Sequence, residues 1–258
     1  MLQQERLHRI QTLLSRVQRL TTERIMNELN TSRETARRDI IELDAMGLAR
    51  RVHGGIVSIE DVATEAPLNV RYAQQTKEKR AIARAALQHL KTGQTVFIDA
   101  GSTTSILAEE LRTLSGLTII TNSLQVVLNL SMANESDPLQ HEIILLGGRI
   151  QHHPQTQGDL VIAEIERYQA DVALLSAVGV SAEQGASSFY SEEACIAAAM
   201  MKHSQQLILM ADHSKLDVVS RVRYAKKQEI SILITDQAAQ ARVDIDNYRK
   251  QLQKVILV

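Results

Sequence analysis

The chain opens with three short patterns in which apolar residues recur every three or four positions. This spacing predicts three amphipathic helices that share one small core. Thr21 or Thr22 is expected to cap the second helix, which should end near Asn30, and Ser32 is expected to start the third. The apolar positions are Leu7, Ile10, Leu13 and Leu14 in the first pattern, Ile25, Met26 and Leu29 in the second, and Ala36, Ile40 and Leu43 in the third.

The third helix leaves basic and hydroxyl side chains facing outward: Arg33, Thr35, Arg37 and Arg38. After Gly47, residues 48–59 read as two short strands around His53-Gly54-Gly55, a tight hairpin. Two helices joined by a short turn, followed by a hairpin, predict a winged helix-turn-helix whose second helix enters the major groove of DNA. Alternatively, the arginines form a solvated face in which Glu34 pairs with Arg38, worth a few tenths of a kcal/mol.

Charge separates this segment from the rest of the chain. Residues 1–57 carry ten Arg and no Lys against seven acidic residues, a net charge of +3, whereas the remaining 201 residues carry 19 basic and 23 acidic residues, a net of −4. The asymmetry suggests an anionic partner for the first segment, and nucleic acid is the usual candidate.

A second, larger domain is predicted by apolar runs that alternate with helical patterns. The fold class is therefore α/β, with the small N-terminal domain followed by a mostly parallel sheet covered on both faces by helices. We expect a DNA-binding domain at 1–59, a linker at 60–75 and the α/β domain at 76–258, with Thr76 capping its first helix. The expected strands are 95–99, 117–121, 142–146, 172–177, 206–211, 231–235 and 254–258.

Polar residues and glycines follow several of these strands. Ligands of open α/β sheets collect at the carboxyl ends of the strands, so these residues are expected to meet at one edge. Each motif alone could be a helix cap, a turn or a surface cation, but together they suit a phosphate with an adjacent polyol. The motifs are residues 99–104 (Asp-Ala-Gly-Ser-Thr-Thr), 121–123 (Thr-Asn-Ser), 147–149 (Gly-Gly-Arg) and 212–215 (Asp-His-Ser-Lys).

The sequence resembles the DeoR family of bacterial regulators over almost its whole length. In the N-terminal part the resemblance rests on Ser32, Thr35, Arg37-Arg38-Asp39, Leu43, Gly47 and Arg51-Val52-His53-Gly54-Gly55. In the larger part it rests on the four sheet-edge motifs and on Glu192-Glu193-Ala194. The resemblance implies a sensor domain that looks like ribose-phosphate isomerase and CoA-transferase folds.

The resemblance also implies roles for individual residues. Asp39 is expected to orient an arginine rather than to touch DNA, and the phosphate of the effector is expected at residues 101–104 and Lys215. Where related sensors usually have a carboxylate before a glycine, this chain has Ser176-Ala177-Val178-Gly179, so one polar contact to the effector is expected to be missing. The expected DNA-binding set is Ser32, Arg33, Thr35, Arg37, Arg38, Arg51, His53 and Gly54. The expected effector-binding set is Asp99, Gly101, Ser102, Thr103, Thr104, Asn122, Ser123, Gly148, Gly179 and Lys215.

These observations predict a transcriptional repressor of a carbohydrate-catabolic operon that binds operator DNA as a homo-oligomer, a dimer or a tetramer, and senses a phosphorylated sugar or sugar acid. The first alternative is a sugar-phosphate isomerase-like enzyme with Asp99 or Asp212 as the base. The second is a DNA-associating protein whose large domain only oligomerises. We expect no catalytic residues, no cofactor and no metal at His152 and His153, and we expect Cys195 to be packed. Without an apolar leader or a membrane-length apolar run, we expect a cytoplasmic protein.

Overall fold

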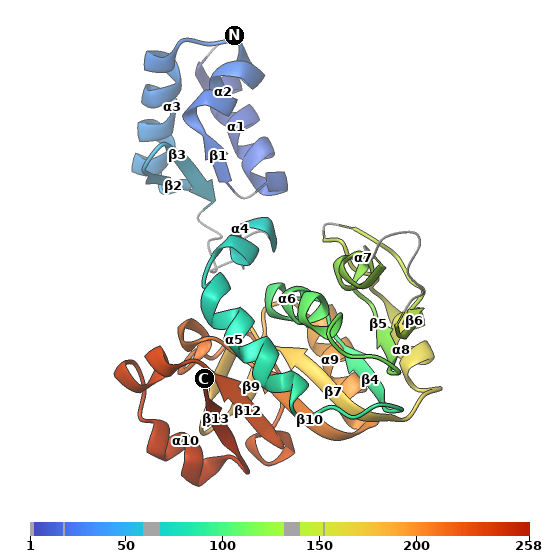
Figure 1. Ribbon diagram of the computed structural model, residues 1–258. Coiled ribbons are helices and arrows are strands. Elements are labelled where there is room, and N and C mark those ends of the chain that lie inside the picture. The colour runs from blue at the N-terminus through green and yellow to red at the C-terminus, as the bar shows by residue number, and fades with distance from the viewer. Residues whose placement is uncertain (1–2, 18, 59–67, 132–139, 152) are drawn as a thin grey trace. The chain divides into compact units, whose positions relative to one another are not determined.

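The computed structural model describes residues 3–17, 19–58, 68–131, 140–151 and 153–258. The chain divides into two compact units, Met1–Thr64 and Glu65–Val258 (Figure 1). The expected end of the first domain at residue 59, residues 60–67 of the expected linker, and His152 lie outside the described residues.

The first unit contains the three predicted helices and the predicted hairpin. Thr21 is the N-cap of the second helix, Asn30 ends it with a left-handed backbone, and Ser32 caps the third helix. A short strand that the sequence did not indicate completes an antiparallel sheet in the order β1-β3-β2. The elements are α1 (Gln3–Val17), β1 (Arg19–Thr21), α2 (Thr22–Leu29), α3 (Arg33–Ala45), β2 (Ala49–Val52) and β3 (Gly55–Ser58).

The second unit is built on a seven-stranded parallel sheet, as predicted. The helices are α4 (Leu68–Ala73), α5 (Thr76–Leu87), α6 (Ser102–Leu111), α7 (Leu124–Ser131), α8 (Asp159–Ile165), α9 (Ser191–Lys202) and α10 (Ile245–Gln251), with short turns η1 (His213–Lys215), η2 (Lys227–Glu229) and η3 (Gln237–Ala241). The strands of the large sheet are β4 (Thr95–Ile98), β5 (Thr118–Thr121), β6 (Glu142–Leu145), β7 (Ala170–Ser176), β10 (Ser204–Met210), β12 (Ile232–Thr235) and β13 (Val255–Leu257).

The order of the strands creates a crevice in the middle of this sheet. The order is β13-β12-β10-β7-β4-β5-β6, so the chain runs outward from β4 through β5 and β6, then crosses to β7 on the other side of β4. Ligands of open α/β sheets bind where the direction of winding reverses in this way. Asp99 follows β4 and Ser176 ends β7, so both lie at this reversal point.

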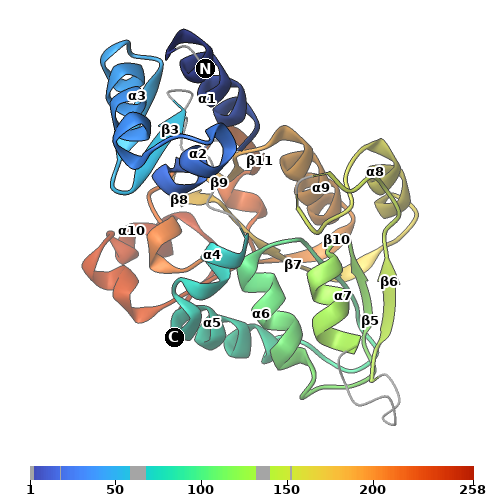
Figure 2. The same ribbon diagram turned by 90° about the horizontal axis from the view of Figure 1, so that it is seen from above.

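Helices cover both faces of the sheet (Figure 2). Figure 2 shows α5, α6 and α7 on one side of the strands and α8 and α9 on the other. Successive residues of each strand enter opposite cores: Val96 and Ile98 belong to the core that includes α5, α6 and α7, whereas Phe97 belongs to the core that includes α8, α9 and α10. This two-sided burial explains why the strands read as continuous apolar runs.

A second sheet of three antiparallel strands was not expected from the sequence. It has the order β11-β9-β8 and consists of β8 (Gly179–Ser181), β9 (Gly185–Ser188) and β11 (Val222–Ala225). Its strands β8 and β9 are rich in Gly and Ser, residues that are typical of turns.

Three local expectations were wrong. Within the stretch expected to be linker, residues 68–73 form helix α4. The N-cap of α5 is Gln75, with φ +52°, and the hydroxyl of Thr76 donates instead to the carbonyl of Tyr72. Cys195 is exposed on α9 rather than packed. Among the helices of the described residues, none has both the length and the apolar composition that crossing a bilayer requires.

Candidate functional site

Helix α3 presents the predicted basic face to solvent. Ser32, Arg33, Arg37 and Arg38 are exposed, and Thr35 is half-buried. The Ser32 hydroxyl accepts a hydrogen bond from the Thr35 backbone N–H at 3.2 Å and lies 2.9 Å from the Thr35 hydroxyl. The start of the helix is therefore fixed by the same two hydroxyl residues that were expected to approach DNA.

The wing, which is the hairpin of β2 and β3, is joined to the helices by hydrogen bonds at both ends. Asp44 of α3 accepts from the Arg51 backbone N–H at 2.8 Å, and the Gly54 carbonyl accepts from the backbone N–H of Thr22 at 2.9 Å. Arg51, His53 and Gly54 are exposed. The hairpin is thus held against α2 and α3 while the predicted contact residues remain accessible.

Asp39 lies on the buried side of α3, where it pairs with an arginine, as expected. It is 1% exposed and accepts from Arg6 Nε at 2.6 Å and from Arg6 Nη2 at 2.9 Å. This bidentate pair raises the pKa of Arg6, chiefly through the hydrogen bond to Asp39. Asp39 therefore ties α1 to α3 and is not accessible to DNA.

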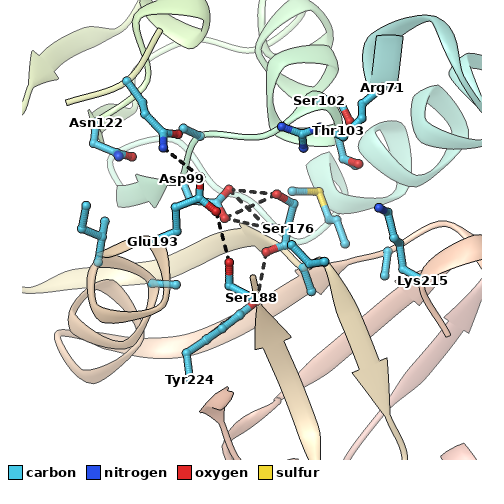
Figure 3. Close-up of a pocket in the computed structure, with 18 residues that line it drawn as sticks. Arg71, Asp99, Ser102, Thr103, Asn122, Ser176, Ser188, Glu193, Lys215 and Tyr224 are labelled. Atoms are coloured by element: carbon cyan, nitrogen blue, oxygen red, sulfur yellow. Dashed lines mark hydrogen bonds between the residues drawn. The ribbon is translucent and has the colours of Figure 1, made fainter. Parts of the chain in front are cut away.

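A pocket opens in the second unit where β4 and β7 end. Five predicted effector residues line it: Asp99, Ser102, Thr103, Asn122 and Lys215. Figure 3 shows Arg71, Ser102, Thr103 and Lys215 toward one side of the pocket, with Asn122 and Glu193 toward the other. A second hollow of about 360 Å³ adjoins it, and the two share Arg71, Ser102 and Lys215.

The cationic side of the pocket is suited to an anion. Helix α6 begins at Ser102, and no side chain caps its N-terminus. Uncapped backbone N–H groups and the helix dipole favour negative charge at that end of a helix. Arg71 from α4 and Lys215 from η1 bring two positive side chains to the same place.

Asp99 lies between the two sides of the pocket. Its carboxylate accepts from the Ser176 backbone N–H at 3.0 Å, and Tyr224 donates its hydroxyl to the Ser176 carbonyl at 2.9 Å. Burial raises the pKa of Asp99 to about 7, although the hydrogen bond from Ser176 acts in the opposite direction. The group is therefore poised to hold or release a proton near neutral pH.

The other side of the pocket is made of neutral polar groups and one carboxylate. Glu193 accepts from Gln155 Nε2 at 2.9 Å and from the Ser188 hydroxyl at 3.1 Å. Asn122 donates its Nδ2 to the Thr156 carbonyl at 3.0 Å, and its buried Oδ1 has no hydrogen-bond partner among the described residues. Such an acceptor suits a ligand that offers hydroxyl protons.

Five predicted effector residues lie close by but do not line the pocket. The Thr104 hydroxyl donates to the Gly101 carbonyl at 3.1 Å, and Ser123 caps α7 by accepting from the Val126 N–H at 3.2 Å. The other three residues are glycines, and a side chain at any of them would collide with a neighbour. Gly101 faces Ser176, Gly148 faces Val161, and Gly179 faces the Val218 carbonyl.

Several lining residues were missed by the expected effector set: Arg71, Ser176, Ser188, Glu193 and Tyr224. Arg71 lay in the stretch assigned to the linker, and Ser188 and Tyr224 belong to the unexpected small sheet. Glu193 was noted in the Glu192-Glu193-Ala194 motif without a role. Val178, at the position of the expected missing carboxylate, does line the pocket.

Possible metal ligands do not gather among the residues that the structure describes, where no group of three His, Cys, Asp or Glu side chains could hold an ion. Of the two histidines considered, His153 lies 6.2 Å from the ring of Tyr190, measured between ring centroids.

Comparison with known proteins finds a family match for each of the two parts of the chain. The DeoR-like helix-turn-helix domain matches residues 6–62, and the DeoR C-terminal sensor domain matches residues 74–237. The HTH-type transcriptional repressor GlcR of Bacillus subtilis is 35% identical over 92% of this chain and 89% of its own length. The glycerol-3-phosphate regulon repressor of Escherichia coli is 30% identical over 84% of each chain.

Solved structures give a weaker likeness. A ribose 5-phosphate isomerase from Methanocaldococcus jannaschii has a TM-score of 0.41 and 16% identity over 55% of each chain. Two matched domains and relatives that cover most of the sequence lead to one conclusion: the chain belongs to the DeoR family of DNA-binding transcriptional regulators.

Proposed function

We propose that this protein represses a carbohydrate-catabolic operon and that a phosphorylated sugar controls it from the pocket of the second unit. The observation that carries the proposal is the uncapped N-terminus of α6 beside Arg71 and Lys215, with hydroxyl-binding groups across the same pocket. The relatives named as repressors, one of them of a glycerol-3-phosphate regulon, support the same function.

In this proposal the phosphate lies at Ser102, Thr103, Arg71 and Lys215. The hydroxyls of the sugar face Asn122, whose Oδ1 would accept one of their protons, and Asp99. Gly101, Thr104, Ser123, Gly148 and Gly179 then support the pocket through the backbone and do not touch the effector.

Operator DNA is bound by α3 and the wing. Arg37 and Arg38 approach base edges or phosphates of the DNA. Near the start of the same helix, the DNA is contacted by Ser32, Arg33 and Thr35. The sugar-phosphate backbone of the DNA is contacted from the wing by Arg51, His53 and Gly54. One winged helix reads few base pairs, so we propose that a dimer or tetramer of the chain engages paired half-sites in the cytoplasm. The effector would bias the spacing of those domains.

The two activities can be separated by matched variants. Arg37→Ala should weaken operator binding about 10- to 100-fold, while Arg9→Ala, which removes an exposed arginine from α1, should have little effect. Lys215→Ala should reduce, without abolishing, the rise in melting temperature caused by sugar phosphates, while Lys202→Ala on the surface of α9 should preserve the full rise. The measurements are DNA titration and thermal denaturation against a panel of sugar phosphates. If Lys215→Ala kept the full thermal response, the proposed pocket would be wrong.

A second candidate function is sugar-phosphate isomerisation. It is favoured by Asp99, since a pocket carboxyl with a pKa of about 7 is what a general base requires. Asp212 is a weaker candidate because its carboxylate accepts from the Ser214 backbone N–H at 3.0 Å and caps η1. We propose binding without turnover. Conversion of ribose 5-phosphate that Asp99→Asn abolishes would favour the enzyme instead.

A further inference from the structure

Lys215 lies on a turn that is too short to fix its position without contacts from elsewhere in the fold. It belongs to η1, a single turn of three residues, and the chain after it enters an uncommon conformation at Asp217, with φ +55°. Non-glycine residues adopt such a backbone only where the surroundings impose it. The contacts around residues 212–217 therefore decide where the Lys215 ammonium lies.

Two carboxylates hold the first two residues of this turn, His213 and Ser214. Asp212 accepts from the Ser214 N–H at 3.0 Å, and Asp236 accepts from the His213 N–H at 2.7 Å. Asp236 also lies 2.9 Å from Nδ1 of His213. These contacts fix residues 213 and 214 but do not reach Asp217.

The end of the turn, at Asp217, is held by Tyr248, which belongs to α10 near the C-terminal end of the unit. Its side chain is 1% exposed, and its hydroxyl oxygen accepts from the Asp217 backbone N–H at 2.9 Å. The hydroxyl proton is shared between the Val180 carbonyl at 2.8 Å and Asp217 Oδ1 at 2.9 Å. Leu216, between Lys215 and Asp217, is buried in the same apolar core as Tyr248.

Tyr248 thus joins α10, β8 and the Lys215 turn through one buried oxygen, yet it does not line either hollow. We propose that Tyr248 is a positioning residue for anion binding: by imposing the left-handed backbone at Asp217, it sets the place of the Lys215 ammonium. This inference rests on the proposed function of the pocket. A lysine side chain has many rotamers, so a fixed backbone lowers the entropy lost when the ammonium meets a phosphate.

The test is a double-mutant cycle with inorganic phosphate as the probe, titrated at constant ionic strength and followed by the melting temperature of the full chain. Tyr248→Phe keeps the ring and removes the hydroxyl, and it should lower phosphate affinity about tenfold. In the Lys215→Ala background the same change should lower it no further, because the side chain being positioned is gone. Tyr168→Phe, at a partly buried ring of the same unit, is the control and should leave the affinity unchanged.

Asp217→Gly provides a second variant that should fold even if Tyr248→Phe does not, because glycine adopts a positive φ without strain. It should give an intermediate loss of phosphate affinity. Equal phosphate affinity in wild type and Tyr248→Phe, or equal effects of that change in both backgrounds, would overturn the positioning role alone. A wild-type chain that neither phosphate nor any sugar phosphate stabilises would overturn the pocket itself, and the positioning role with it.

Discussion

At the scale of single residues, Asp99 illustrates what sequence can and cannot predict. Its place after a buried strand was enough to predict that it lies at the pocket, because carboxyl ends of parallel strands share one edge. Its proton affinity was not predictable, since it depends on burial and on the Ser176 backbone N–H, 77 positions away in the sequence. The sequence around Asp99 does not indicate that it will contact Ser176.

The raised pKa of Asp99 predicts a stability that depends on pH. Its folded-state pKa of about 7 lies above the usual carboxyl value near 4. The folded state therefore keeps the proton that the unfolded state releases, and stability should fall as pH rises from about 4 to about 7, by up to about 4 kcal/mol. Asp99→Asn, which cannot ionise, should lack this loss.

Urea unfolding of the second unit between pH 4 and pH 8 measures the effect. Asp246→Asn, at an exposed position of α10, should follow the wild-type curve. Parallel curves for wild type and Asp99→Asn would show that Asp99 ionises normally in the fold.

At the scale of elements, amphipathic helices and buried strands were predicted well, and elements stabilised by distant partners were not. Helix α4 is short, and its C-terminal end is held by the ammonium of Lys79, which donates to the carbonyl of Arg71 at 2.5 Å and to that of Gln74, just after the helix, at 2.8 Å. Strands β8 and β9 read as turns because they lack β-branched and aromatic patterns. In both cases tertiary contacts outweigh local preference, and Arg71, Ser188 and Tyr224 were missed as a result.

Two adjacent glycines in the wing allow a direct comparison of backbone strain with close packing. Gly54 has φ +81° but open space around it, whereas a side chain at Gly55 would collide with the backbone of β1 at Leu20 and Thr21. Gly54→Ala should cost about 1 kcal/mol of stability. Gly55→Ala should cost about 2–3 kcal/mol, because β1 must move away from β3.

Urea unfolding of the first unit, followed by circular dichroism, distinguishes these costs. The wild-type chain is the reference, and an equal loss in the two variants would mean that β1 is not held close to the wing.

At the scale of the whole molecule, the two units have separate apolar cores. We therefore predict two unfolding transitions in calorimetry.

Asp39→Ala should lower only the first unit's transition, by about 3 kcal/mol in stability, because it removes the buried carboxylate that pairs with Arg6. A bound sugar phosphate should raise only the second unit's transition. Glu34→Ala, at an exposed position of α3, is the control for the first change, and a single transition that responds to both perturbations would contradict the prediction.

The order of strands in the large sheet also bears on how the protein is made. Its central pair joins β4 to β7, which the chain reaches only after β5, β6 and their helices. Pairings between distant segments form slowly, and domains fold in turn from the N-terminus during synthesis. The helix and wing are complete long before Ser176 leaves the ribosome. Each new chain therefore passes through a stage at which its DNA-binding unit is complete and its effector pocket is not, and a chain that ended before β7 would never form that pocket.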